Sequence, residues 1–396
     1  MADKTLFKGG TIIDGNGGNP VKGELLIEGK DILEVGNVNS SDAKVVDVSG
    51  KFIMPGLINC HVHCLYEGSS PDPFSIMSKE SDAMTALRGA RNLKKMLYSG
   101  VTFFRDMGAR NHVDIELRKA RSEGLIEGPE FHAAGRAIVM TGGHGWMSGR
   151  EADGCDEVRK AAREQLRAGA DLIKIMATGG VMTAGVEPGS AQLSYEEIAV
   201  AVEEANKAGK KTATHAQGST GIMNAVRAGI NSIEHGFFLT DEIIELMLKK
   251  GTYLVPTFYA AYSIWKNGVE AGIAAQAVEK IKKVMTAHRE SFQKAYKAGV
   301  KIAMGPDTGT PLNPADATAL EVAMMVENGM SVRDAIVCST KSGADLLGIS
   351  QRYGTIEKGK AADFLILSAN PLENIEALKN NLDCVYKLGK RFGGRD

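Results

Sequence analysis

Two closely spaced histidines, His61 and His63, are the first residues in the sequence that could do chemistry. They lie in the stretch INCHVHCLY, with Cys60 and Cys64 on either side of the pair. If this stretch is a strand, its side chains alternate between two faces, so the histidines point one way and the cysteines the other. Two imidazoles on one face suit a zinc ion. Because the histidines and the cysteines point to opposite faces, the four residues cannot share one ion, and we expect the cysteines to pack behind the strand.

Four more polar residues each follow a different apolar run of the sequence. They are Lys174 in DLIKIMA, His215 in ATHA, His235 in IEHG and Asp307 in MGPDTG. Taken singly, either histidine could be an ordinary hydrogen-bonding residue, and Asp307 could be a turn former. In a barrel of parallel strands, however, the active site is built at the carboxyl ends of the strands. Together with His61 the set predicts one convergent site.

Lys174 has an unusual setting, because its neighbours in the run are Leu172, Ile173, Ile175 and Met176. A buried amine must extend to solvent, pair with a carboxylate or lose its charge, and burial lowers the pKa of a lysine. A neutral amine can add carbon dioxide to form a carbamate, which acts as a carboxylate able to bridge two metal ions. The alternative interpretation is an ordinary buried ion pair.

These residues must be positioned by a repeating strand and helix pattern. Eight apolar, β-branched runs recur along the chain: KFIMPGLINCHV, GVTFFRD, PEFHAAG, ADLIKIMA, KKTATHA, INSIEHG, GTYLVPTF and GVKIAMG. Stretches rich in helix formers separate them, such as 155–169 and 194–210, and the latter opens with a capping box from Ser194 to Glu197. The alternation predicts an α/β protein with a closed (β/α)8 TIM barrel.

The two ends of the chain have a different texture. Residues 1–54 and 355–396 contain short alternating strands separated by Gly, Asn and Asp turns, without a helix-length pattern. We therefore expect a small β-sandwich assembled from both ends, flanking a barrel at 55–354.

The composition narrows the class of protein and of partner. The chain has 396 residues with 47 basic and 48 acidic side chains, a formal net charge of −1 and no long run of one sign. This balance argues against a nucleic-acid or membrane partner and favours a small-molecule substrate. The start, MADKTLFKGG, lacks the apolar core of a signal peptide, so a cytoplasmic location is expected. The five cysteines are too few for a disulfide framework.

Taken together, the HVH pair, the lysine, the two later histidines and the aspartate resemble the metal-dependent amidohydrolase superfamily. FIMPGLINCHVH and GTIEKGKAADFLIL are similar to its borders between sandwich and barrel. TGGHGWMSG, ADGCDEVRKAAREQLRAGADLIKIMATGGV and SIEHGFFLTDE resemble more narrowly the imidazolonepropionase-like branch that includes Xaa-Pro and Xaa-Arg dipeptidases. Pro306 departs from the pattern, because a small polar residue is common before the aspartate.

The resemblance implies a binuclear site with two divalent ions, zinc by default, and a carbamate formed from carbon dioxide. The implied ligands are His61, His63 and Asp307 on one metal, His215 and His235 on the other, and carboxylated Lys174 bridging both. A metal-bridging hydroxide would attack the substrate carbonyl. Catalytic roles are implied for Asp307, as base and then acid, for His235, and for His144 in TGGHG as a substrate or oxyanion contact.

The function expected from this resemblance is cleavage of the amide bond of a dipeptide or N-acyl amino acid. The ligand set leaves cyclic-amide hydrolysis of the hydantoinase or imidazolonepropionase type open. A mononuclear deaminase is less favoured, since it uses a glutamate where Gly218 stands, and a structural zinc site would be rich in cysteine. Expected pocket residues are Tyr66, Phe237, Tyr259 or Tyr262, and the loop 181–189. The segment 260–298 could be a lid, the seventh helix or the interface of a homo-oligomer.

Overall fold

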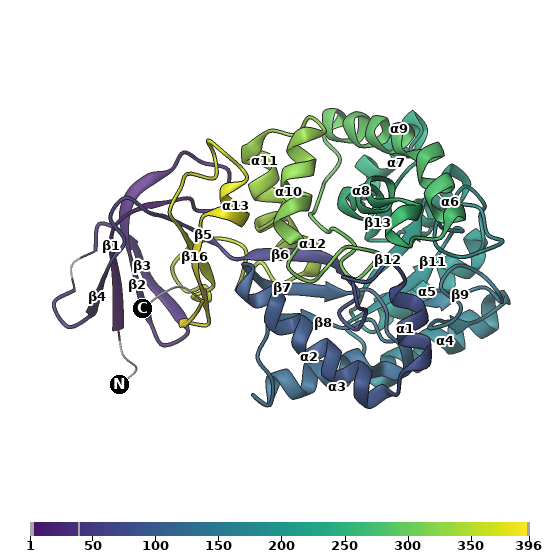
Figure 1. Cartoon of the computed structure of the whole chain (residues 1–396), viewed down its shortest axis with the longest axis horizontal. Coiled ribbons are helices and arrows are strands. Elements are labelled where there is room, and N and C mark those ends of the chain that lie inside the picture. Colours follow the sequence, from purple (N-terminus) through teal and green to yellow (C-terminus); the bar gives the residue numbers. More distant parts are fainter. Residues whose placement is uncertain (1–3, 39, 394–396) are drawn as a thin grey trace.

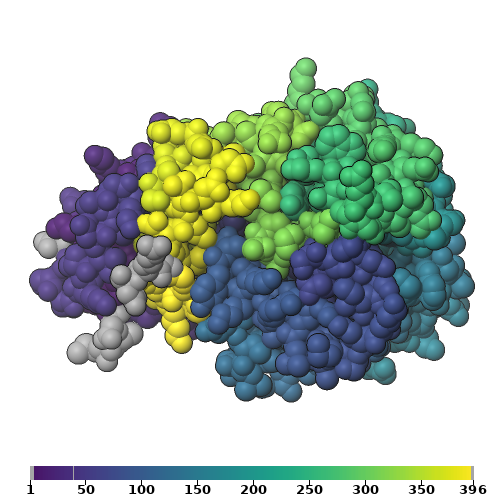
Figure 2. Space-filling view, in the orientation of Figure 1, coloured from purple at the N-terminus to yellow at the C-terminus, as the bar shows by residue number. Residues whose placement is uncertain are grey.

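The chain folds into a large α/β part flanked by a smaller sheet that contains strands from both chain ends (Figure 1). The computed structural model describes residues 4–38 and 40–393. The outermost residues of the predicted end modules, 1–3 and 394–396, and residue 39 lie outside the described part. In Figure 2 the segment near the C-terminus, drawn in yellow, lies between the purple N-terminal strands and the rest of the molecule.

The smaller sheet has eight strands in the order β17-β16-β15-β5-β1-β2-β3, with β4 also paired to β1. Its strands are β1 (Lys4–Ile12), β2 (Val21–Glu28), β3 (Asp31–Gly36), β4 (Lys44–Asp47), β5 (Phe52–Pro55), β15 (Phe364–Leu367), β16 (Leu382–Lys387) and β17 (Lys390–Phe392). The expectation that the two ends combine is confirmed, because β5 pairs with β1 on one side and β15 on the other. The predicted two-layer sandwich is not confirmed, since the pairing gives a single sheet.

The larger part contains two sheets of parallel strands. One has the order β6 (Leu57–Val62), β7 (Val101–Asp106), β8 (Glu130–His132); the other has β10 (Arg150–Glu151), β9 (Ile138–Val139), β11 (Leu172–Met176), β12 (Lys211–Ala216), β13 (Ser232–His235), β14 (Tyr253–Val255). The segment 301–308 makes isolated parallel bridges from Ile302 to Leu254 and from Thr308 to Val62. The α/β class is thus confirmed, whereas a closed barrel is not detected among the described residues.

Helices surround the parallel strands (Figure 1). They are α1 (Pro73–Lys79), α2 (Asp82–Tyr98), α3 (Val113–Ser122), α4 (Gly154–Ala168), α5 (Tyr195–Lys207), α6 (Ser219–Ala228), α7 (Asp241–Lys250), α8 (Phe258–Asn267), α9 (Ala275–Ala298), α10 (Thr318–Glu327), α11 (Val332–Cys338), α12 (Lys341–Leu347) and α13 (Ala377–Asn380), with 3-10 turns η1 (Arg110–His112) and η2 (Val269–Ala271). The predicted capping box is confirmed, because the Ser194 hydroxyl and Glu197 carboxylate each accept a hydrogen bond from the other residue's backbone N–H.

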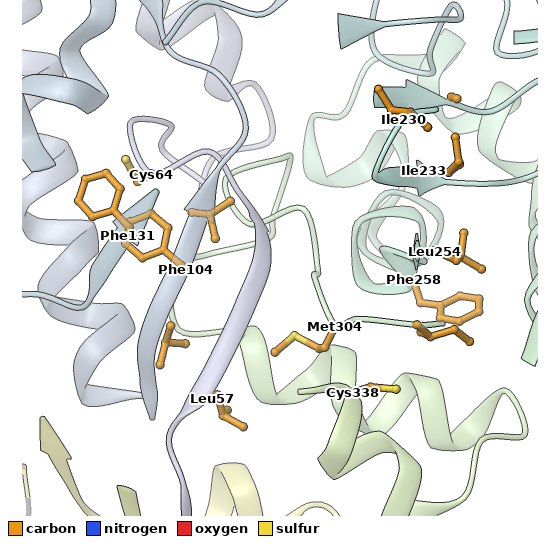
Figure 3. Packing of buried hydrophobic residues seen from close by; sticks show 14 of the residues in the cluster. Leu57, Cys64, Phe104, Phe131, Ile230, Ile233, Leu254, Phe258, Met304 and Cys338 are labelled. Atoms are coloured by element: carbon orange, nitrogen blue, oxygen red, sulfur yellow. The ribbon is translucent and has the colours of Figure 1, made fainter. Parts of the chain in front are cut away.

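Apolar packing between the strands and the helices holds the site's framework in place. The rings of Phe104 and Phe131 stack with centroids 4.4 Å apart, in the same cluster as Cys64 (Figure 3). Cys60 is buried in a neighbouring cluster with Ile58. Both cysteines therefore pack in the core, as predicted, and neither belongs to the group formed by His61, His63 and Asp307. Within the described part of the chain, no helix combines the length and apolar character needed to span a bilayer.

Candidate metal centre and active site

His61, His63 and Asp307 form a compact cluster at the carboxyl end of β6. Asp307 Oδ1 lies 3.3 Å from Nε2 of each histidine. One ligand atom from each residue falls within 4.8 Å of the others. Asp307 Oδ1 is buried and has no hydrogen-bond partner among the described residues, which a cation at this position would satisfy. These donors fit a divalent metal ion, and zinc is among the ions they suit.

A buried polar chain fixes the His61 ring. Its Nδ1 lies 2.8 Å from Oε2 of Glu234, and Arg105 donates to the other carboxylate oxygen at 2.9 Å. Burial raises the pKa of Glu234, but the Arg105 charge and the His61 hydrogen bond outweigh it and hold that pKa at about 2. The carboxylate therefore stays ionised and leaves His61 Nε2 directed toward Asp307. This is the partner that metal-ligating histidines commonly have.

The remaining histidines of the set are also anchored through one ring nitrogen. The contacts are His63 Nδ1 to the Gly108 carbonyl at 3.3 Å, His215 Nε2 to the Gly179 carbonyl at 3.0 Å, and His235 Nδ1 to the Thr257 hydroxyl at 2.7 Å. The His235 ring centroid lies 5.3 Å from that of His61 and 4.4 Å from that of His215. Burial lowers the pKa of His215 and His235 well below the usual value, so both rings are neutral and can act as ligands.

Two residues of the site adopt left-handed backbone conformations. The φ of His235 is +73° and that of Asp307 is +60°. Such angles are uncommon for residues other than glycine and cluster at functional sites. Asn313 holds the Asp307 turn by donating to the Asp307 carbonyl at 2.9 Å. The peptide bond before Pro306 is trans, so the departure from the family pattern leaves the carboxylate in the cluster.

Lys174 lies on β11 and is 1% exposed. Burial lowers its pKa to about 8, although the charges of Glu234 and Asp307 oppose the shift. Within the described part of the chain its amine takes part in no ion pair, so the alternative of an ordinary buried salt bridge is not what the structure has. Lys174 and Met176 are two positions apart on β11 and so share one face of the strand, and Met176 pairs with His215 on β12. This register places Lys174 near His215 and His235.

A cavity of about 750 Å³ opens beside these groups. His63, His144, His215, His235 and Asp307 line it. Its walls are largely apolar and include Met77, Met107, Trp146, Met147, Met176, Met182, Ile264 and Ile281. Three predicted substrate contacts also line the cavity, namely Tyr66, Phe237 and the loop residues Val181–Ala184. Segment 260–298 contributes a wall, since residues of α8 and α9 lie in the lining.

Tyr259 is not brought to this cavity. It lines a separate one of about 560 Å³, together with Tyr262 and Lys266. The reason is helical periodicity, because α8 turns Ala260 and Ile264 toward the active site and the tyrosine face away from it. The prediction of Tyr259 as a substrate contact is therefore not supported by its position.

His144 stands over the second pair of histidines. Its ring centroid is 4.3 Å from that of His215, and its Nδ1 lies 2.8 Å from the Thr183 hydroxyl. Burial lowers the pKa of His144 to about 4, so the ring is neutral. Gly180 makes this approach possible, since a Cβ there would come 2.5 Å from the ring. The orientation leaves Nε2 available to a ligand in the cavity.

Several residues around the site escaped sequence reasoning. Lys280 of α9 reaches across to the loop over the cavity and donates to the carbonyls of Thr183 and Val186 at 3.0 and 2.5 Å. Glu234 could have been suspected, because it directly precedes His235. Nothing local in the sequence singles out Lys280, whose partners lie about a hundred positions earlier.

A buried His, His and Asp cluster at the carboxyl ends of parallel strands, opening on an apolar cavity, defines the class of α/β metal-dependent hydrolases. The chain belongs to the amidohydrolase family, whose model matches residues 52–392. This family is generally metal-dependent, and the relatives described below are hydrolases. The chain is therefore an enzyme of the hydrolase class.

Individual relatives cover nearly the whole chain. Ochratoxinase of Aspergillus niger is 32% identical over 427 aligned positions, which span 99% of this chain and 87% of that protein. The crystal structure of a Xaa-Pro dipeptidase with methionine bound in its active site superposes with a TM-score of 0.91 and 34% identity. The match covers 99% of this chain and 100% of that one. The crystal structure of a prolidase complexed with N-methylphosphonate-L-proline superposes with a TM-score of 0.89 and 30% identity. The match covers 99% of this chain and 100% of that one.

Proposed function

We propose that the protein hydrolyses the amide bond of a dipeptide or N-acyl amino acid. The observation that carries this proposal is that His63, His215, His235 and Asp307 line one apolar cavity. The buried His61 contacts Asp307, and the buried Lys174 lies on β11, which pairs with the strand of His215. Similarity to ochratoxinase and to Xaa-Pro dipeptidases supports an amide substrate. The apolar walls favour substrates with bulky uncharged side chains.

The proposed metal centre holds two divalent ions, most simply zinc. His61, His63 and Asp307 would hold one ion and His215 and His235 the other, with Lys174 shared between them. The amine of Lys174 would add to carbon dioxide, forming an N–C bond and releasing a proton. Its lowered pKa supports this step, because a substantial fraction is neutral near pH 8. When bound, the ions supply Lewis-acid polarisation and an activated water.

The side chains then divide the remaining work. Asp307 accepts the proton of the attacking water and delivers it to the leaving nitrogen, since its carboxylate faces the cavity. Burial raises the pKa of Asp307, but the neighbouring His61 and His63 lower it by more, so the carboxylate is ionised before the reaction. His144 donates from Nε2 to the carbonyl oxygen as negative charge develops there. The largely apolar walls disfavour water around the reacting groups.

The fold that we propose for this site is a single barrel of eight strands. The bridges of Ile302 to Leu254 and Thr308 to Val62 support it, because segment 301–308 then stands between β14 and β6. A hydrogen bond from Asp171 N to the Ala133 carbonyl, 2.8 Å long, links the other ends of the two parallel sheets. The small sheet is proposed as a separate module built from 1–54 and 355–396.

The backbone beside His215 argues against the deaminase alternative. A glutamate three residues after this histidine would have to replace Gly218, and a Cβ there would come 2.2 Å from the Gly189 carbonyl. The loop over the cavity therefore occupies the space that such a side chain needs. Hydrolysis of cyclic amides remains the second candidate function, because enzymes of the hydantoinase type use the same set of metal ligands.

Metal content tests the proposal. Protein purified with zinc and bicarbonate should contain close to two ions per chain, and Lys174→Ala should lose both metal and hydrolysis of N-acyl amino acids. Lys280→Met is a matched control, since it removes another largely buried lysine away from the proposed ligands, and its metal content should stay at the wild-type level. One ion per chain, unaffected by Lys174→Ala, would contradict the binuclear site.

A further inference from the structure

Gln217 is a buried polar residue in the cavity that the mechanism above does not use. It follows His215 by two positions in HAQG, is 3% exposed and lines the active-site cavity. Its Oε1 has no hydrogen-bond partner among the described residues. Buried polar atoms are usually paired, so an unpaired acceptor on a residue that lines a cavity needs an explanation.

Only a few described side-chain atoms share this condition. Besides Gln217 Oε1 they are Asp114 Oδ1, Asn313 Oδ1 and Asp307 Oδ1, and of these four residues only Gln217 and Asp307 line the cavity. Asp307 Oδ1 is accounted for by the metal centre. Gln217 is therefore the one whose partner must come from whatever the cavity binds.

Hydrogen bonds hold the backbone of Gln217 in place beside the cavity. Its N–H donates to the Thr178 hydroxyl at 3.0 Å, and its carbonyl accepts the N–H of Phe238 at 3.0 Å. The next residue, Gly218, packs directly against Gly189. Movement of this backbone away from the cavity would break these contacts, so the point from which the carboxamide extends is fixed before a ligand arrives.

The cavity offers a ligand few competing charges. Its described lining contains no lysine or arginine, and Lys280 is occupied by the carbonyls of Thr183 and Val186. Asp72, the acidic lining residue besides Asp307, accepts the Ser75 N–H at the start of α1. Neutral polar groups must therefore orient the substrate, and a carboxamide oxygen selects a partner with an N–H.

We propose that Gln217 is a substrate-binding residue whose Oε1 accepts the N–H of the scissile amide, so that the enzyme selects secondary amides. The inference rests on the proposed amidohydrolase function and narrows its substrate class. His215 at the end of β12 and Gln217 just after it both line the cavity, which puts the carboxamide on the same wall as a proposed metal ligand. A prolyl amide has no N–H to offer, so the preference is opposite to that of a Xaa-Pro dipeptidase.

The test compares two substrates that differ by one methyl group. N-acylalanine and N-acyl-N-methylalanine with the same aromatic acyl group are assayed on the zinc-loaded enzyme, Gln217→Met and Gln217→Glu. The wild type should favour the secondary amide by about tenfold or more in kcat/KM. Gln217→Met should lose most of this preference, chiefly through the secondary amide, whereas Gln217→Glu keeps an acceptor and should retain it. Gln276→Met, at an exposed glutamine of the same cavity, should leave the preference unchanged.

Each outcome decides the role of Gln217. Equal kcat/KM values for the two amides on the wild type, or an equal loss for both in Gln217→Met, would overturn the inference. Hydrolysis of neither amide would instead refute the proposed function. In that case calorimetric dissociation constants of the same two compounds still decide the role, because a missing N–H should weaken binding to the wild type but not to Gln217→Met.

Discussion

Replacement of Glu234 by glutamine tests the buried chain that orients His61. The change keeps the shape of the side chain, removes its charge and replaces one acceptor oxygen by an NH2 donor. Arg105, which is 1% exposed, would then be a buried guanidinium without a counter-ion. Since the same side chain fixes His61, Glu234→Gln should weaken both the fold and the metal centre.

Two independent arguments give the size of the effect on the fold. Removal of one partner from a buried ion pair costs about 3–5 kcal/mol. The pKa of Glu234, at about 2 against an ordinary value of 4.5, corresponds to about 3 kcal/mol in favour of the ionised form. Because the folded pKa is depressed, this stability is present above pH 4.5 and is lost as the pH falls toward 2. Glutamine imitates the protonated acid, so the loss should be seen already at neutral pH.

The assay is urea unfolding of the metal-loaded protein at pH 7, with metal affinity measured alongside. We expect the free energy of unfolding of Glu234→Gln to fall by about 3 kcal/mol and its metal affinity by about 10- to 100-fold. Glu203→Gln, at an exposed glutamate, should leave the unfolding midpoint unchanged. Addition of Arg105→Met removes the unpaired charge, so the double variant should be more stable than the single one. A single variant within about 1 kcal/mol of the wild type would refute the reasoning.

Substitutions at four further residues test other parts of the site. Cys60→Ser and Cys64→Ser should each leave metal content unchanged, because both thiols pack in the core; loss of an ion in either would contradict the alternation along β6. Lys280→Met should raise KM more than it lowers kcat, since the loop at Thr183 loses a charged donor, and Lys280→Arg should restore part of the affinity. In Lys174→Ala, added short carboxylates should restore some activity by replacing the carbamate. If saturating carboxylate restores no activity, the proposal of a carbamate on Lys174 is contradicted.

Sequence reasoning found the parts of the site that depend on strand ends. The alternation of side chains along β6 correctly separated His61 and His63 from their flanking cysteines, and burial of Lys174 followed from its apolar neighbours. These predictions succeed because a strand's period of two is a local property. The placement of His215 and His235 near the same cavity follows from neighbouring parallel strands.

Features that depend on long-range contacts could not be predicted in the same way. The third run, PEFHAAG, does contain a strand, β8, but nothing in it predicts the further strand β9, which follows a turn at Gly135 with a φ of +67°. The prediction of Tyr259 as a substrate contact was wrong because the position of a residue within one helical turn decides whether it meets the cavity, and the sequence does not show which face of α8 does so. Gln217 carries no motif, and only the enclosing loop shows that its acceptor is buried without a partner.

The shared sheet at the chain ends has a consequence for protein synthesis. Strand β5 leaves the ribosome early with β1 beside it, yet its other neighbour, β15, begins only at Phe364. At usual elongation rates the interval is roughly 15 to 60 seconds, during which one edge of β5 is open to pairing with other nascent chains. A chain that stops before Phe364 keeps that edge permanently. Slow translation and premature termination are therefore the conditions under which this protein is most exposed to aggregation.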